Sequence, residues 1–234
     1  MPILECNNLT KRFGSVEALT DVSFSVEPGR IVGLLGPNGS GKTTMIKLIN
    51  GLLTPTSGQV LIDGEAPGKR SHALVSYLPD RSCLPQWMTA AQLLDFYRDF
   101  YPDFREDAAK EMLSRLEIPE KRRMKQLSKG TREKVQLIMV MSRAAKLYLL
   151  DEPIGGVDPA TRDYILQTII GNYNPEASVI LSTHLIADVE KVLDDVLFIN
   201  QGRIMLRTSV DQIREEKGMS VDQLFREVFK CWEN

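Results

Sequence analysis

A glycine-rich segment in the first fifth of the chain carries residue types suited to binding phosphate. Residues 36–43 read GPNGSGKT and match the pattern GxxxxGK(S/T). Glycines let backbone amides curl around an anion without Cβ clashes, and a helix that follows directs its positive end at the same anion. Lys42 can reach the β- and γ-phosphates of a nucleotide, and Thr43 can offer a hydroxyl to Mg²⁺. The segment therefore predicts a nucleotide-phosphate site.

A second segment ends in two carboxylates. Residues 147–152 read LYLLDE, an apolar run followed by Asp151 and Glu152. Adjacent strand residues point to opposite faces, and the end of a strand frees both for solvent. Asp151 is placed to hold Mg²⁺ through water, and Glu152 is placed to polarise a nucleophilic water. Together with the glycine-rich segment, this pair predicts a nucleotide hydrolase.

The segments that position these residues alternate between strand and helix patterns. The apolar run 31–35 suits a strand buried on both faces, and residues 44–53 suit a helix after the glycine-rich loop. Short N-terminal strands are expected at 3–6, 22–26 and 59–64. The last third reads as strands at 147–150, 179–181 and 196–199 and helices near 160–170 and 185–193. This alternation predicts an α/β fold with a mostly parallel sheet.

The middle third and the C-terminal tail have helical patterns. Thr89 and Gln92 fit a capping box, and residues 103–106 fit a second helix start, so residues from about 87 to 142 are expected to be mostly helical. The segment 220–230 is amphipathic, with an apolar face formed by Val221, Leu224, Phe225, Val228 and Phe229. We expect that face to pack inside the molecule, and a partner or self-association surface is the alternative.

Composition argues against several protein classes. The 234 residues include 29 Lys plus Arg and 31 Asp plus Glu, a formal net charge of −2, which argues against a general nucleic-acid binder. Apolar runs fall short of the roughly 20 residues that span a bilayer, and the first residues lack a signal-peptide pattern. Cys6, Cys83 and Cys231 form no CxxC pair, and two histidines are too few for a His-rich metal site. These features predict a cytoplasmic globular protein with reduced thiols.

A third set of residues makes a family resemblance specific. Residues 127–131 read LSKGT and resemble the signature sequence of ABC-type ATPases, whose usual form is LSGGQ. Phe13 lies where that family places an aromatic residue that stacks on adenine. Residues 155–158, GGVD, resemble its D-loop, and residues 182–184, STH, resemble its switch-histidine segment. Because the motif order agrees from about residue 3 to residue 202, the chain resembles the ATP-binding subunits of ABC transporters.

The resemblance implies a fold and an assembly. The fold is that of a P-loop NTPase (RecA-like), with a mostly parallel sheet core, an N-terminal antiparallel β part and a helical subdomain. We expect a single nucleotide-binding domain over residues 1–234, with the helical subdomain at about 87–142 and a C-terminal helical tail at about 209–232. In this family two copies pack head to tail, and each ATP is held between the P-loop of one copy and the signature of the other.

Roles follow for the matching residues. The resemblance implies that Glu152 is the general base, that His184 couples the γ-phosphate to Glu152, and that Lys42 binds phosphate. ATP and Mg²⁺ are the expected cofactors. The residues expected around the phosphates are Gly36, Asn38, Gly39, Ser40, Gly41, Lys42, Thr43 and Thr44. Those expected near Mg²⁺ are Thr43, Asp151 and Asp80.

The remaining roles concern the base and the second subunit. Phe13 is expected to stack on adenine, with a plain core position as the alternative, and a surface or capping position is the alternative for His184. Ser128 and Gly130 are expected to contact the γ-phosphate of the opposite subunit's ATP, and Asp158 is expected to line the dimer interface.

Two motifs depart from the family pattern, at three positions. Asp80 follows the predicted strand 75–78 where the family has Gln, and Lys129 and Thr131 replace the usual Gly and Gln of the signature. Asp80 can still accept from water or approach Mg²⁺, but it adds a negative charge near the phosphates. We therefore expect altered Mg²⁺ affinity or altered coupling to the membrane partner. Lys129 adds a positive charge close to the opposite subunit's phosphate.

The resemblance implies the ATP-binding and hydrolysing subunit of an ABC transporter, similar to bacterial exporters of the drug- and antibiotic-resistance group. The expected partners are a second ATP-binding subunit, in a homodimer or heterodimer, and a separate transmembrane permease, with no nucleic acid. The expected location is the cytoplasm, at the inner face of the membrane. Leu84, Pro85, Trp87 and Met88 are candidate docking residues, whereas the basic run 121–125 is expected to be a solvated loop rather than a phosphate or lipid contact.

Two alternatives remain open. One is a soluble ABC-type ATPase that acts on a macromolecular assembly and not in transport. The other is an ordinary P-loop kinase or GTPase, which is disfavoured by the signature-like and D-loop-like segments and by the lack of a guanine-reading NKxD pattern.

Overall fold

The core of the protein is a six-stranded sheet with the order β5-β6-β7-β3-β8-β9. The structure is a computed structural model that describes residues 1–155, 159–172, 174 and 176–230. The sheet consists of β3 (Ile31–Leu35), β5 (Val75–Leu78), β6 (Leu147–Asp151), β7 (Ser178–Thr183), β8 (Asp195–Asn200) and β9 (Arg203–Ser209). Neighbouring strands are parallel except β8 and β9, which pair antiparallel. Every residue of β3 and β6 is buried, as expected for strands covered on both faces. The predicted mostly parallel sheet is confirmed.

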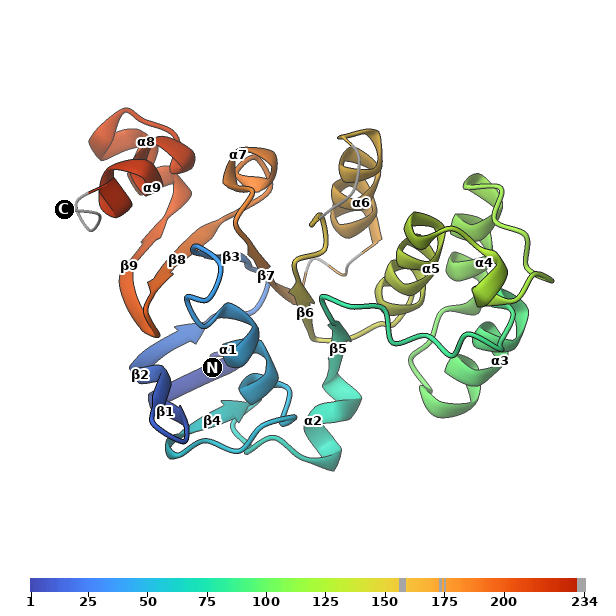
Figure 1. Cartoon of the computed structure of the whole chain (residues 1–234), viewed down its shortest axis with the longest axis horizontal. Helices are drawn as coiled ribbons and strands as arrows, with labels where there is room; N and C mark the ends of the chain where they lie inside the picture. The colour runs from blue at the N-terminus through green and yellow to red at the C-terminus, as the bar shows by residue number, and fades with distance from the viewer. Residues whose placement is uncertain (156–158, 173, 175, 231–234) are drawn as a thin grey trace.

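A second sheet of three antiparallel strands lies beside this core (Figure 1). It contains β1 (Leu4–Phe13), β2 (Val16–Val26) and β4 (Ser57–Ile62), in the order β2-β1-β4. β1 and β2 are much longer than the short strands that the sequence predicts. Exposed residues stand where the two strands meet at the hairpin turn, and register shifts after Cys6 interrupt the alternation, so the apolar pattern marks only their inner ends.

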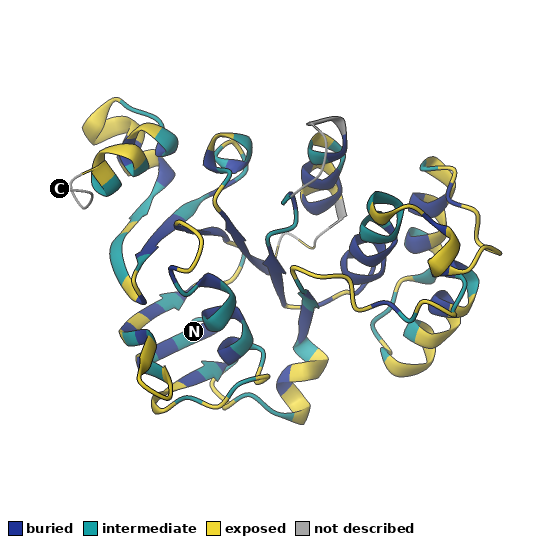
Figure 2. Ribbon diagram, viewed as in Figure 1, coloured by how far each residue is buried: buried dark blue, intermediate teal, exposed yellow. Residues whose placement is uncertain are grey.

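Helices cover both faces of the six-stranded sheet. α1 (Lys42–Ile49) packs between the two sheets, where Met45, Ile46 and Ile49 join one buried apolar cluster. α5 (Lys129–Met141), α6 (Pro159–Asn172) and α7 (Ile186–Val189) lie on the other side (Figure 1). Figure 2 shows the buried residues concentrated along the central strands and on the facing sides of these helices. α2 (Lys69–Leu74) leads into the edge strand β5.

Two predicted helices are shorter in the structure. The helix expected over 44–53 ends at Ile49, and Gly51 turns the chain with a φ of +71°. The helix expected near 185–193 is reduced to α7. Asp194 explains the second difference, because its carboxylate accepts from the Ile31 amide at 2.8 Å and its own amide donates to the Ile31 carbonyl at 2.9 Å. This pairing draws the chain into β8, so the helix does not continue to residue 193.

A helical region lies at one end of the molecule (Figure 1). It comprises α3 (Ala90–Phe100), α4 (Glu106–Arg115), the 3₁₀ turn η1 (Met124–Gln126) and α5. The predicted capping box starts α3, because Thr89 Oγ1 accepts from the Gln92 amide and the Gln92 side chain accepts from the Thr89 amide. α4 begins at Glu106, within the predicted 103–106 start. Leu93, Leu113 and Ile138 belong to a separate apolar cluster that holds this region together.

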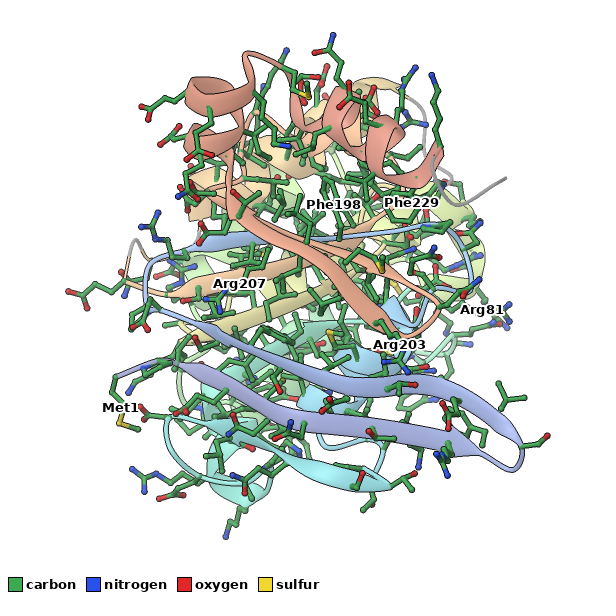
Figure 3. The ribbon with its side chains drawn as sticks, turned by 90° about the vertical axis from the view of Figure 1, so that its left-hand side faces the viewer. Met1, Arg81, Phe198, Arg203, Arg207 and Phe229 are labelled. Carbon is green, nitrogen blue, oxygen red and sulfur yellow. The ribbon has the colours of Figure 1, made fainter. Side chains whose placement is uncertain are left out.

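The C-terminal helices α8 (Val210–Lys217) and α9 (Val221–Lys230) return to the sheet. Phe198 of β8 lies 5.3 Å from Phe225 and 6.3 Å from Phe229, between ring centroids. Figure 3 shows Phe198 and Phe229 on the sheet side of these helices. The apolar face of α9 therefore packs inside the molecule, as the sequence predicts. No described helix has the length and apolar character needed to cross a membrane.

Candidate functional site

The glycine-rich loop joins the carboxyl end of β3 to the start of α1. Gly41 has a φ of +110°, a conformation that favours glycine, and a Cβ there would lie 2.8 Å from the Ala18 carbonyl oxygen. A Cβ on Gly36 would lie 2.3 Å from the Ile199 carbonyl oxygen. The loop can therefore follow this path only with glycines at these two positions. It delivers Lys42 to the first turn of α1, where the ammonium donates to the carbonyls of Gly36 at 2.8 Å and Pro37 at 3.2 Å.

The carboxyl end of β6 places Asp151 beside the start of α1. Asp151 Oδ1 accepts from Ser182 Oγ at 2.7 Å and from Thr43 Oγ1 at 3.2 Å. Its other oxygen, Oδ2, is buried and has no hydrogen-bond partner in the structure. Burial raises the pKa of Asp151, and the hydroxyl groups of Ser182 and Thr43 act in the opposite direction. A buried carboxylate oxygen without a partner, next to a threonine hydroxyl, is a donor set that fits Mg²⁺.

Glu152 lies where β6 ends and has a φ of +51°, which is rare for a residue other than glycine. Its backbone amide donates to Ser182 of the neighbouring strand β7, at 3.1 Å to both the carbonyl oxygen and Oγ. The side chain of Glu152 is only 13% exposed, with Oε1 3.3 Å from Lys42 Nζ. His184 Nδ1 lies 3.2 and 3.1 Å from the two carboxylate oxygens. The structure thus brings Lys42, Glu152 and His184 into direct contact, and pairing across β6 and β7 holds them there.

These residues line one cavity of about 640 Å³ at the carboxyl ends of the parallel strands. Ligands of open α/β sheets bind at that edge. Of the predicted site residues, the cavity is lined by Asn38, Gly39, Gly41, Lys42, Thr43, Thr44, Asp80, Glu152 and His184. Another cavity of about 710 Å³ lies near the amino end of β6 and is lined by other residues, including Asp63, Lys146 and Ala177. The smaller cavity therefore carries the chemistry.

Sequence reasoning missed three residues of the cavity lining, which are Val16, Glu17 and Ala18. The lining also includes Lys129, which was expected close to the opposite subunit's phosphate, and Gly155 of the D-loop-like segment. The three missed residues come from the start of β2, where the hairpin turn brings Val16 opposite Phe13. The only signal in the sequence is their closeness to Phe13, because the exposed end of this hairpin carries no apolar alternation.

Phe13 itself does not line the cavity. Its side chain is 47% exposed at the end of β1, and Lys11 Nζ lies 5.1 Å from its ring centroid. Its cross-strand partner Val16 does line the cavity and is also exposed. The ring therefore lies at the margin of the site, and stacking on adenine stays a prediction.

The signature residues occupy the start of α5. Ser128 caps this helix, because its Oγ accepts from the Thr131 amide at 3.1 Å. A Cβ on Gly130 would meet nothing within 4 Å, so this stretch of surface is open. Neither Ser128 nor Gly130 lines the cavity, whereas the exposed Lys129 between them does. Asp158, expected at a dimer interface, lies outside the described residues.

Asp80 is exposed directly after β5 and faces the same cavity. It adds to the effect of burial in raising the pKa of Asp151. Burial, with smaller contributions led by Asp151, also raises the pKa of the neighbouring Tyr77 to about 12. Asp80 is thus close enough for its charge to affect the carboxylate that fits Mg²⁺.

The expected docking residues are only partly exposed. Leu84 is buried in the apolar cluster of the helical region, and Met88 packs against the same cluster. Their side chains therefore support the fold, and the prediction that they are exposed is wrong. Trp87 is 63% exposed. The exposed cations Arg123 and Lys125 lie on an adjacent segment, because the Lys125 amide donates to the Gln86 carbonyl and Thr89 bridges to Arg123.

Comparison with known proteins agrees with this geometry. A sequence model described as ABC transporter matches residues 19–155. The ABC transporter ATP-binding protein YtrB of Bacillus subtilis is 33% identical over 217 residues, which cover 92% of this chain and 74% of YtrB. The SkfA peptide export ATP-binding protein SkfE of Bacillus subtilis is 32% identical, with 92% of this chain and 93% of SkfE covered.

A third relative and a solved structure extend the agreement. The lipopolysaccharide export system ATP-binding protein LptB of Haemophilus influenzae is 30% identical, with 93% of this chain and 95% of LptB covered. A solved ATP-binding subunit of an ABC transporter superposes with a TM-score of 0.87 at 29% identity, covering 97% of this chain and 99% of that one.

Proposed function

Because this chain belongs to the ABC transporter family and is an ATP-hydrolysing subunit of it, we propose that it powers export through a separate transmembrane permease. Residues 1–234 form one nucleotide-binding unit that pairs head to tail with a second such subunit, at the inner face of the membrane. Export is supported by the names of two relatives, a peptide export protein and a lipopolysaccharide export protein. The same names disfavour the alternative of a soluble ATPase that acts on an assembly.

The proposal rests on the contact between Lys42, Glu152 and His184 beside the partnerless oxygen of Asp151. The loop amides at 36–41 and the start of α1 bind the phosphates of ATP. Thr43, Asp151 and Asp80 would hold Mg²⁺, which would neutralise charge on the phosphate oxygens. Phe13 stacks on adenine from the margin of the cavity.

Lys42 links phosphate binding to the readiness of the general base. Its ammonium lies 3.3 Å from Glu152 Oε1 and also donates to two loop carbonyls. A phosphate bound in the loop competes for this ammonium, so ATP releases Glu152 from the ion pair. The freed carboxylate accepts a proton from water as the water oxygen attacks the γ-phosphorus. The bond to the β–γ bridging oxygen then breaks, which yields ADP and phosphate.

His184 and the second subunit complete the site. His184 Nδ1 contacts Glu152, so one nitrogen orients the general base while the other can meet the γ-phosphate. The signature residues Ser128 and Gly130 act on the ATP of the opposite subunit, and Asp158 lines the interface. Trp87 docks the permease, an assignment supported by its 63% exposure. Loss of permease co-purification after Trp87→Ala tests that role.

Replacing Glu152 by Gln tests the proposed function. The amide keeps the shape of the side chain but is a poor base, so Glu152→Gln should bind ATP and lose hydrolysis by at least about 100-fold. It should also accumulate as an ATP-dependent dimer, measured by size-exclusion chromatography beside a phosphate-release assay.

Lys42→Ala is the matched control, because it removes the phosphate contact and should prevent both ATP binding and dimer formation. Hydrolysis by Glu152→Gln at the wild-type rate would show that Glu152 is not the general base.

A further inference from the structure

Two of the three residues that depart from the family pattern line the same two cavities. Asp80 and Lys129 both line the nucleotide cavity of about 640 Å³. Both also line a neighbouring cavity of about 420 Å³ between the segment after β5 and the start of α5. A signature residue acts on the opposite subunit's ATP in the proposed dimer, but Lys129 lines the same cavity as the P-loop of its own chain. This position raises the question of what Lys129 does for its own nucleotide.

We propose that Lys129 acts within its own chain as a charge partner of Asp80 and strengthens binding of the triphosphate to its own P-loop. The inference rests on the proposed function, because it requires ATP in this cavity. Lys129 is a positioning residue here: its ammonium offsets the Asp80 carboxylate, which would otherwise repel the phosphates. The two departures then form one compensated pair.

The charges around the cavity support this role. Glu17, Asp80 and Glu152 contribute carboxylates to the lining, and among the described residues the lysines there are Lys42 and Lys129. Lys42 is already held by Glu152 and by two carbonyls. Arg81 and Arg132 line only the neighbouring cavity, and the Arg132 guanidinium donates to the Leu127 carbonyl at 2.7 Å. Among the described basic side chains, Lys129 is the one that lines both of these cavities together with Asp80.

The contacts of Lys129 leave its ammonium able to move. Its side chain is 77% exposed, and its one ion pair with a described residue is to Glu133, at 3.7 Å. An exposed pair of this length contributes little and releases the ammonium easily. Ser128, by contrast, is fixed as the helix cap and does not line the cavity. Adjacent residues of the signature can thus act on different nucleotides: Ser128 acts on the ATP of the opposite subunit, and Lys129 acts on the ATP of its own chain.

The test is nucleotide binding by the monomeric chain, in which no second subunit can contribute. A non-hydrolysable ATP analogue is titrated in the presence of EDTA, so that the Mg²⁺ role proposed for Asp80 does not contribute, at a protein concentration where sedimentation velocity shows only monomer. Lys129→Gln should weaken binding about three- to tenfold, and Asp80→Asn should strengthen it by a similar factor. The double variant should return to within about twofold of wild type. Each effect should shrink as salt concentration rises, because the site is open to solvent.

Two further variants check specificity. Lys129→Arg keeps the charge and should keep wild-type affinity. Lys134→Gln removes a lysine from the same helix that lines neither cavity, and it should leave binding unchanged. Lys129→Gln should weaken the binding of ADP less than that of the ATP analogue, because ADP lacks the terminal phosphate.

One result would overturn the proposal: unchanged analogue binding by monomeric Lys129→Gln while ATP-driven dimer formation changes. Lys129 would then act only on the opposite subunit. Failure of the wild-type monomer to bind the ATP analogue at all would instead contradict the proposed function. The two failures are therefore distinguishable in one titration series.

Discussion

At the scale of single residues, Ser182 shows how one side chain positions two others. Its Oγ donates to Asp151 at 2.7 Å and accepts from the Glu152 amide at 3.1 Å. Because parallel pairing sets Asp151 opposite Ser182, β7 controls where the end of β6 points its carboxylates. The left-handed backbone of Glu152 is stabilised by the same contact, an example of strain that the surrounding structure supports at a functional site.

Asp151→Asn should separate metal binding from stability. The amide can keep accepting from Ser182 and Thr43, but it loses the charge that fits Mg²⁺. We expect the gain in ATP affinity on adding Mg²⁺ to fall by about 10- to 100-fold, measured by titration with and without EDTA. An undiminished Mg²⁺ effect would show that Asp151 does not hold the metal.

The same variant has a pH-dependent effect on the metal-free protein. Burial raises the pKa of Asp151 in the folded state, so folding disfavours its charged form. Above the raised pKa the carboxylate is charged in both states, and the folded protein carries the full cost. Below the ordinary Asp pKa the group is neutral in both states. Asp151→Asn should therefore stabilise the metal-free protein at pH 7, and urea unfolding should show that advantage disappearing as pH falls through this window.

The sequence predicted the catalytic and phosphate-binding residues better than the other residues that line the cavity. Residues 36–44, Asp151 and Glu152 could be identified because their spacing reflects contacts made within one loop or at one strand end. The contact between Lys42 and Glu152 could not, since it depends on which strands pair. The part that Val16 plays in the cavity depends on a hairpin whose exposed end gives no periodic signal.

At the scale of elements, Arg143 ties the helical region to the sheet. Its guanidinium donates to both carboxylate oxygens of Asp103, at 3.1 Å each, and to the carbonyls of Val75 and Ala73. It also lies 4.1 Å from the ring centroid of Tyr101, and only 3% of the residue is exposed. One buried cation thus joins the start of β5, the connection between α3 and α4, and the end of α5.

Arg143→Ala should lower the free energy of unfolding by about 3 kcal/mol, because it leaves Asp103 and two carbonyls without their donor. Urea denaturation measures this change. Arg143→Lys should recover only part of the loss, since an ammonium cannot reproduce the planar set of bonds. Arg115→Ala, which breaks an exposed pair with Glu111, is the control and should change stability by less than about 0.5 kcal/mol. Equal effects at positions 143 and 115 would contradict the role assigned to Arg143.

Elements were predictable where burial leaves a periodic signal. β3, β6 and α9 have apolar patterns that match their environments, because each buries a defined face. The length of α7 was not predictable, since the pairing of Asp194 with Ile31 ends it and involves residues 163 positions apart. Long-range pairing of this kind overrides local propensity.

At the scale of the whole molecule, the site of a single chain is open where a second copy would complete it. Ser128 and Gly130 are exposed or unobstructed at the start of α5, and neither lines the chain's own cavity. In a head-to-tail dimer, each ATP site combines the P-loop of one chain with the signature of the other. A P-loop substitution and a signature substitution that affect the same site therefore lie on different chains. The symmetry of the assembly can then be tested by mixing variants.

Mixing Lys42→Ala with Gly130→Asp should restore ATPase activity that each variant lacks alone. Gly130→Asp fits the open space at the start of α5, where a carboxylate suits the helix terminus but repels a phosphate. In a mixed dimer one site carries both lesions and the other carries none. Each mixed dimer holds one intact site of two, so the mixture should reach at most about half of the wild-type activity. Phosphate release is measured at a fixed total protein concentration, with each variant mixed with itself as the control. A mixture as inactive as its components would contradict a homodimer with shared sites, because only sharing places the two intact halves together.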